Sequence, residues 1–114
     1  MKPLRSEDLR HKLEIRRPTE APNDDGGYDT SWTTIATPWA EVLGLDGRES
    51  VMDQALQGIS TYRIRIRWRG GIEPADQVRG YAGRELNITS AVDPDGKREQ
   101  LVILATTESA RAEP

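Results

Sequence analysis

The chain has 114 residues, a length that suits one domain with a single core. Charged residues make up 31% of the chain and hydrophobic residues 35%, which is little apolar material for a core that stands alone. We therefore expect some apolar surface to become buried only in an assembly. The net charge of -3 argues against a general nucleic-acid binder, and the lack of cysteine excludes disulfides and thiolate metal sites.

The first third of the chain predicts strands separated by a loop. Residues 11–16 alternate between two faces, which indicates a strand, and Pro18 should end it because proline donates no hydrogen bond to a ladder. The Pro, Asn, Asp and Gly residues within 19–30 then predict a long exposed loop. Residues 31–45 favour two strands with a bend at Thr37–Pro38 between them.

The segment 46–57 changes to a helical period. Apolar residues recur four positions apart within it, and Gly58 stands where a helix would end. We expect a helix of two to three turns, which is marginal alone and needs a surface to dock on unless it is mobile. Two roles fit this segment equally: a lid on one end of the domain, or a movable element that reaches a neighbour or a central channel.

The second half of the chain predicts further strands. Residues 60–69 form one, and residues 76–92 form two that are joined tightly around Ala82–Gly83, where glycine supplies the unusual backbone angle. Residues 93–98 have the chemistry of a turn, and residues 99–107 predict a final, more buried strand. Strands at short, regular spacing indicate a mainly β fold, either a small antiparallel barrel or a sandwich.

We expect residues 1–107 to form the domain and residues 108–114 to be a flexible C-terminal tail without fixed structure until something binds it. No stretch has the length of a membrane span and none resembles a signal peptide, so the protein is expected to work in a cytoplasm or to leave it inside a particle.

The most unusual feature is a row of arginines in the strand 60–69, at Arg63, Arg65, Arg67 and Arg69. Because strand side chains alternate, this row should occupy one face, while the apolar residues between the arginines point into the core. A plain structural role is a charged solvent face that discourages aggregation. Functional roles are pairing with acidic protein surface, within or between subunits, or lining a path for DNA. Sequence-specific DNA recognition is not expected, because the aromatic residues point away from the row.

Catalytic chemistry is poorly represented. His11 is the sole histidine, and the sequence places no serine or thiol nucleophile near it. Asp93 and Asp95 begin like a calcium loop, but its later ligands are missing, and no glycine-rich phosphate cradle is present. The sequence therefore predicts neither an enzyme nor a bound cofactor or metal.

Four segments in order resemble the phage head–tail joining family, the head-closure or stopper proteins of long-tailed phages and related gene-transfer particles. They read DLRHKLEIRRP, WAEVLGLDGRE, YRIRIRWRGGI and GRELNITSAVDPDGKREQLVIL. No single segment is diagnostic, but their order and spacing together are specific, and the resemblance covers residues 8–105.

The resemblance implies a small antiparallel β-barrel with one short helix between its second and third main strands. It also implies a homo-oligomeric ring in the neck of a virion, assembled in the bacterial cytoplasm. Such a ring lies between portal and adaptor proteins on the head side and tail terminator or tail tube proteins on the tail side. It retains packaged DNA, docks the tail and later lets DNA pass without sequence-specific binding. Members of the family are not enzymes and need no cofactor.

By position, residues 44–58 correspond to the excursion that faces the channel in such proteins. The candidate gate residues are Arg48, Glu49, Asp53, Gln54 and Gln57. The alternative from a different class is a small nucleic-acid-binding β-barrel module that uses the Arg63–Arg69 face.

Overall fold

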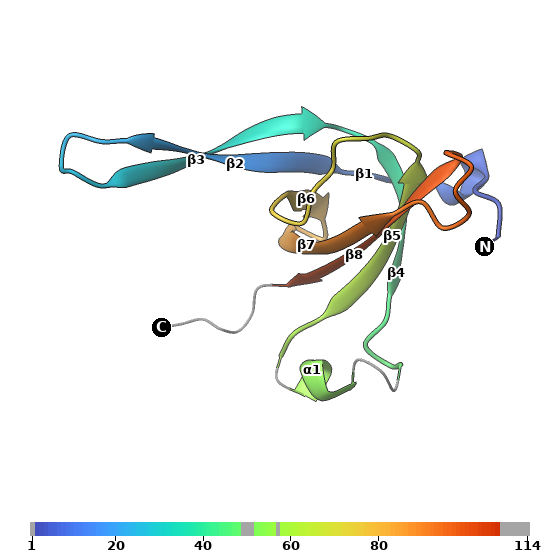
Figure 1. Ribbon diagram of the computed structural model, residues 1–114. Helices are drawn as coiled ribbons and strands as arrows, with labels where there is room; N and C mark the ends of the chain where they lie inside the picture. The colour runs from blue at the N-terminus through green and yellow to red at the C-terminus, as the bar shows by residue number, and fades with distance from the viewer. Residues whose placement is uncertain (1, 49–51, 57, 108–114) are drawn as a thin grey trace.

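The computed structural model describes residues 2–48, 52–56 and 58–107, and these form one eight-stranded antiparallel sheet in the order β1-β4-β5-β8-β7-β6-β2-β3 (Figure 1). The elements are, in chain order, the 3-10 helix η1 (Ser6–Asp8), β1 (His11–Lys12), β2 (Glu14–Pro22), β3 (Tyr28–Ala36), β4 (Trp39–Gly44), α1 (Met52–Leu56), β5 (Thr61–Arg67), β6 (Gln77–Tyr81), β7 (Arg84–Val92) and β8 (Gln100–Thr107). The mainly β, antiparallel character predicted from the sequence is confirmed.

The ends of the sheet meet along one stretch of chain. β1 and β2 are separated only by Leu13, yet β1 pairs with β4 and β2 pairs with β6, which are far apart in the sheet order. The backbone N–H of Leu13 donates to the Pro38 carbonyl at 2.9 Å. The sheet thus wraps around its core. Its two edge strands, β1 and β3, are not hydrogen-bonded to each other. A closed barrel therefore stays a prediction.

The core lies inside this wrapped sheet and is built from alternate residues of its strands. Ile64 and Ile66 of β5 are fully buried, as the alternation predicts, and Tyr62 and Trp68 pack against the core from its border. The buried apolar cluster comprises Leu13, Ile15, Ala36, Ala40, Ile64, Ile66, Val78, Leu86, Ile88, Leu101, Ile103 and Ala105. None of these side chains is larger than leucine, which keeps the core small.

The prediction that Pro18 ends the first strand is wrong. β2 continues to Pro22 and pairs with β3 along its whole length, so the predicted loop 19–30 shrinks to the turn 23–27. Proline is tolerated because β2 beyond Arg16 pairs with β3 alone and leaves its other edge without a ladder. Residues 17–34 form a two-stranded hairpin arm that projects from the body (Figure 1).

Other local predictions hold. The bend at Thr37–Pro38 separates β3 from β4, and β6 turns into β7 through Ala82 and Gly83, both at positive φ. Asp93 organises the next turn, because its carboxylate accepts hydrogen bonds from the backbone N–H groups of Gly96 and Arg98.

The helical segment is described only in part. α1 has five residues, Met52–Leu56, against the two to three turns predicted, and residues 49–51 and 57 lie outside the described part of the chain. Gly58 follows at φ +85, the left-handed conformation expected after a helix end.

Gly80 marks the closest approach between β6 and the β1–β2 segment. Its φ is +105°, within a bulge between Arg79 and Tyr81, and a Cβ at this position would lie 3.3 Å from the Lys12 carbonyl oxygen. Glycine is therefore required on two counts, the backbone angle and the space.

We expect Gly80→Ala to lower the free energy of unfolding by about 1–3 kcal/mol, because alanine is strained at this φ and its methyl group meets backbone. Urea denaturation measures the change. Gly27→Ala is the matched control, because its nearest neighbours are 3.8 Å away; it should stay within about 0.5 kcal/mol of wild type. Equal effects of the two substitutions would contradict this account of Gly80.

Candidate functional site

The arginine row of β5 does not form one continuous exposed face. β5 lies inside the sheet between β4 and β8, and only 2% of Arg65 is exposed. Arg63 is half-buried, whereas Arg67 and Arg69 are exposed. The alternation was predicted correctly, but the outer face of the strand is covered at its centre, so the four side chains have three different environments.

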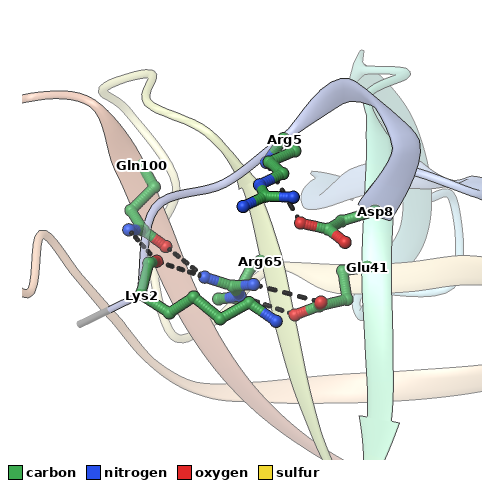
Figure 2. Close-up of polar contacts among 6 residues, drawn as sticks. All are labelled: Lys2, Arg5, Asp8, Glu41, Arg65 and Gln100. Atoms are coloured by element: carbon green, nitrogen blue, oxygen red, sulfur yellow. Dashed lines mark hydrogen bonds and ion pairs between the residues drawn. The ribbon is translucent and has the colours of Figure 1, made fainter.

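Arg65 forms a bidentate ion pair with Glu41, its cross-strand neighbour on β4 (Figure 2). Its Nε donates to Oε1 at 2.5 Å, and its Nη2 donates to Oε2 at 3.0 Å. Its Nη1 donates to the Lys2 carbonyl at 2.7 Å and to the Gln100 side-chain carbonyl of β8 at 3.1 Å. Every nitrogen of the guanidinium group thus has a partner, as a buried charge requires.

The N-terminal segment, residues 2–8, supplies the cover over this face. The Lys2 carbonyl accepts from Arg65 and also from the Gln100 amide at 3.1 Å, and the Ser6 hydroxyl accepts from Arg67 at 2.9 Å. Figure 2 shows the segment passing over β5 beside β4. Sequence reasoning assigned this segment no role, because its contacts are backbone carbonyl and hydroxyl groups that leave no residue pattern.

The electrostatics of the pair support a structural role for Arg65. The hydrogen bond from Arg65 is the main reason that the pKa of Glu41 lies below its ordinary value, and the same bond raises the pKa of Arg65. Both groups therefore stay charged near neutral pH and neutralise each other. Arg65 cannot reach a phosphate without breaking this network.

A second ion pair fixes the hairpin arm to the body. Arg17, at the base of the arm, donates from Nε and Nη2 to the two carboxylate oxygens of Asp76, both at 2.9 Å. The Asp76 side chain is fully buried and also accepts the Glu73 backbone N–H at 2.8 Å, while Arg17 donates to the Gly71 carbonyl. This connection ties the base of the arm to residues 71–76, between β5 and β6.

The exposed end of the arginine row borders an apolar hollow of about 310 Å³, which we call the tryptophan groove. Trp39 is 52% exposed there, and the guanidinium group of Arg98 stacks over Trp68 at 5.1 Å from the ring centre. The lining residues are Leu9, Pro38, Trp39, Arg67, Trp68 and Arg69.

The sole histidine packs against an aromatic ring. His11 lies on β1 with its ring edge-to-face against Tyr81 at 5.1 Å. No group of acidic or histidine side chains within the described ranges is arranged to hold a metal ion. A larger, open cleft of about 650 Å³ lies beside β6 and β7, lined by Arg79, Arg84 and Glu85 among others. None of the helices in the described ranges is long and apolar enough to cross a bilayer.

The candidate gate residues are only partly described. Arg48 is exposed, and its backbone N–H donates to the Leu45 carbonyl at 2.9 Å. Glu49 and Gln57 lie outside the described residues, and of Asp53 and Gln54 only the backbone in α1 is described. Their assignment to a channel stays a prediction.

Comparison with known proteins agrees with the resemblance drawn from the motifs. The model of a family described as phage head completion protein matches residues 4–108. A search of the curated proteins finds no match.

Two solved structures are similar. The solution structure of protein SF1141 from Shigella flexneri 2a shares 25% sequence identity, with 95% of this chain and 100% of that chain covered and a TM-score of 0.71. A chain in the virion of a native gene transfer agent particle shares 17% identity, with 87% and 94% covered and a TM-score of 0.61. At that lower identity the likeness concerns the fold alone.

Glu41→Gln should lower the free energy of unfolding by about 1–3 kcal/mol at pH 7, because Arg65 loses its charged partner while remaining buried. The pKa of Glu41 is lowered in the folded state, so its contribution is complete above the ordinary pKa of about 4.5 and is lost as the pH falls through the folded pKa. The difference between variant and wild type should therefore shrink below pH 4.5. Denaturation curves at several pH values measure it.

Glu99→Gln, at an exposed position, is the control for this prediction and should change stability by less than about 0.5 kcal/mol at any pH. A Glu41→Gln effect that is constant from pH 7 to pH 3 would show that the ion pair does not stabilise the fold.

Proposed function

The chain belongs to the phage head completion protein family, and on this premise we propose that it forms a ring in the neck of a virion. The family gives it a structural role where the phage head is completed and the tail is joined, and places it in the virion particle. The finer proposal is that the ring sits between portal–adaptor proteins and tail proteins, retains packaged DNA and docks the tail. The single observation that carries it is the family match over residues 4–108, which is nearly the whole described chain.

The surface supports an assembly of unlike faces. The hairpin arm projects as an acidic element, while the tryptophan groove is bordered by arginines. A contact between unlike faces of identical subunits repeats around an axis and closes into a ring when the rotation allows. Exposed apolar side chains, including Tyr28, Trp39 and Leu56, are surface that such contacts bury.

A passage for DNA requires a surface that does not hold phosphates tightly. The net charge of -3 suits this, because strong phosphate neutralisation gives tight, salt-dependent binding. We assign the channel-facing role to residues 44–58, with Arg48 and its neighbours Glu49, Asp53, Gln54 and Gln57 as the candidate gate. This assignment rests on the family's arrangement.

The nucleic-acid module is the weaker candidate. It needs Arg63, Arg65, Arg67 and Arg69 on one accessible face, but Arg65 is buried against Glu41 and the N-terminal segment. The remaining exposed arginines lie at one end of the strand beside apolar side chains, which favours a protein partner.

We expect particles that lack this protein to package DNA without retaining it and to carry no tails. Supplying the wild-type protein should restore DNA-filled, tailed particles, counted by negative-stain electron microscopy. Supplying the exposed variant Thr30→Ser should restore them equally, as a control for the procedure. Normal DNA-filled, tailed particles in the absence of the protein would overturn the proposed function.

The isolated protein should bind double-stranded DNA with a dissociation constant above about 10⁻⁴ M at physiological salt, weaker than typical non-specific binders. Fluorescence anisotropy over a salt series measures this, with light scattering reporting the mass of the protein. A monomer that binds in the micromolar range, with log K falling about three units or more per unit of log salt, would favour the nucleic-acid module instead.

A further inference from the structure

The tip of the hairpin arm is built as a rigid acidic element. The Asn23 side-chain carbonyl accepts the backbone N–H groups of Asp25 and Gly27, both at 3.0 Å, and its amide donates to Asp29 at 3.0 Å. The backbone N–H of Asn23 also donates to the Gly27 carbonyl at 2.9 Å. A tip held in one conformation loses little entropy on docking.

Beyond Arg17, the charged residues of the arm are all acidic, and an aromatic side chain is exposed at its tip. Residues 18–34 include no lysine or arginine but four carboxylates, and Tyr28 at the tip is 68% exposed. The carboxylates are Glu20, Asp24, Asp25 and Asp29. Trp32, further along β3, holds Arg16 over its ring at 4.9 Å and so belongs to the base of the arm.

The tryptophan groove has the complementary properties. Its lining combines apolar side chains, including Trp39 and Trp68, with two cationic ones, Arg67 and Arg69. Neither Arg67 nor Arg69 forms an ion pair with any residue in the described ranges, and Arg98 adds a third cation over Trp68. An aromatic side chain flanked by carboxylates matches this surface in both polarity and charge.

The arm of a subunit cannot fill its own groove. Strands of nine residues span about 30 Å, and the arm carries its turn away from the body (Figure 1). The segments that form the groove follow η1, join β3 to β4 and end β5, on the opposite side of the molecule from that turn. The occupant must therefore come from another molecule.

We infer that the tip of the hairpin arm, residues 22–28, docks in the tryptophan groove of the next copy of this chain. Tyr28 packs against Trp39 and Trp68, and Asp24 and Asp25 lie opposite Arg67 and Arg69. The inference rests on the proposed function, which supplies the second copy, and it names the contact that joins neighbours in the ring. The Arg17–Asp76 ion pair holds the base of the arm against the body.

Complementary variants test this contact. The arm variant Asp24→Lys/Asp25→Lys keeps its groove, and the groove variant Arg67→Glu/Arg69→Glu keeps its arm. Light scattering should find each variant alone monomeric, with self-association weakened about tenfold or more relative to wild type, because like charges now meet. Their equimolar mixture should associate about as strongly as the wild type, with the two variants alternating, because the lysine arm then meets the glutamate groove and the native arm meets the native groove.

Restored association of the mixture is the decisive result. Contacts between unlike variants join opposite charges, whereas each variant alone sets like charges against each other. Arg79→Glu/Arg84→Glu, with the same charge change beside β6 and β7, is the matched control and should associate like wild type. Circular dichroism melting confirms that each variant is folded. Wild-type association of both the arm variant and the groove variant alone, or a mixture that associates no better than either variant alone, would overturn the inference.

Cross-linking provides a second measurement that works even where wild-type association is weak. The chain has no cysteine, so single cysteines can be placed at Gly27 in the tip and Gly70 beside the groove, where a Cβ meets nothing closer than 3.6 Å. A mixture of Gly27→Cys and Gly70→Cys should give a heterodimer with a short bismaleimide. Gly27→Cys mixed with Thr89→Cys, an exposed site on β7, should not. Equal yields from the two mixtures, or none from either, would overturn the inference.

Particle complementation separates failure of this contact from failure of the proposed function. If the wild type restores tailed particles and the arm and groove variants restore them equally well, the contact is wrong and the connector function stands. If the wild type itself neither restores particles nor is found in them, the proposed function fails first. Cross-linking to another neck protein in place of a second copy would also contradict the inference and identify a different occupant for the groove.

Discussion

The buried ion pair between Arg65 and Glu41 is the constraint on which the outer face of the sheet depends. A guanidinium group that is 2% exposed is tolerated only when its charge and all its donors are satisfied. Glu41 supplies the charge from β4, and Gln100 and Lys2 supply oxygens from β8 and the N-terminal segment. One side chain thereby links three sheet positions and fixes where the N-terminal segment lies.

This arrangement gives the arginines of the row different environments. The central Arg65 forms its contacts within the subunit, whereas Arg67 and Arg69 are exposed and line the groove with Trp39 and Trp68. A guanidinium group beside an indole ring and without an ion pair in the described part of the chain is suited to a partner that brings both carboxylates and apolar surface. The hairpin arm, held at its base by the buried Asp76, carries carboxylates and the exposed ring of Tyr28. The core is small, and the chain leaves large apolar side chains such as Tyr28 and Trp39 exposed.

Local chemistry accounts for what sequence reasoning predicted correctly. Alternation placed Ile64 and Ile66 in the core, and turn chemistry located the Ala82–Gly83 turn, because these features depend on residues next to one another. The arm was missed because Pro18 and the turn-forming residues after it are typical of a loop. Their strand conformation comes from pairing with β3, where Pro18 lies opposite Trp32. The burial of Arg65 could not be predicted from the sequence either, because its hydrogen-bond partners lie 24, 35 and 63 positions away in the chain.

The sequence by itself determined the mainly β character, the positions of the tight turns and the order of motifs that marks the family, since these reside in spacing and residue type. The tertiary structure alone decided which arginines are covered, that the predicted loop is an arm, and that Trp39 and Trp68 come together beside Arg69. The physical reason is that these features arise from contacts between segments distant in the chain. Their energies depend on pairing register, burial and the direction of each side chain, none of which a run of neighbouring residues specifies.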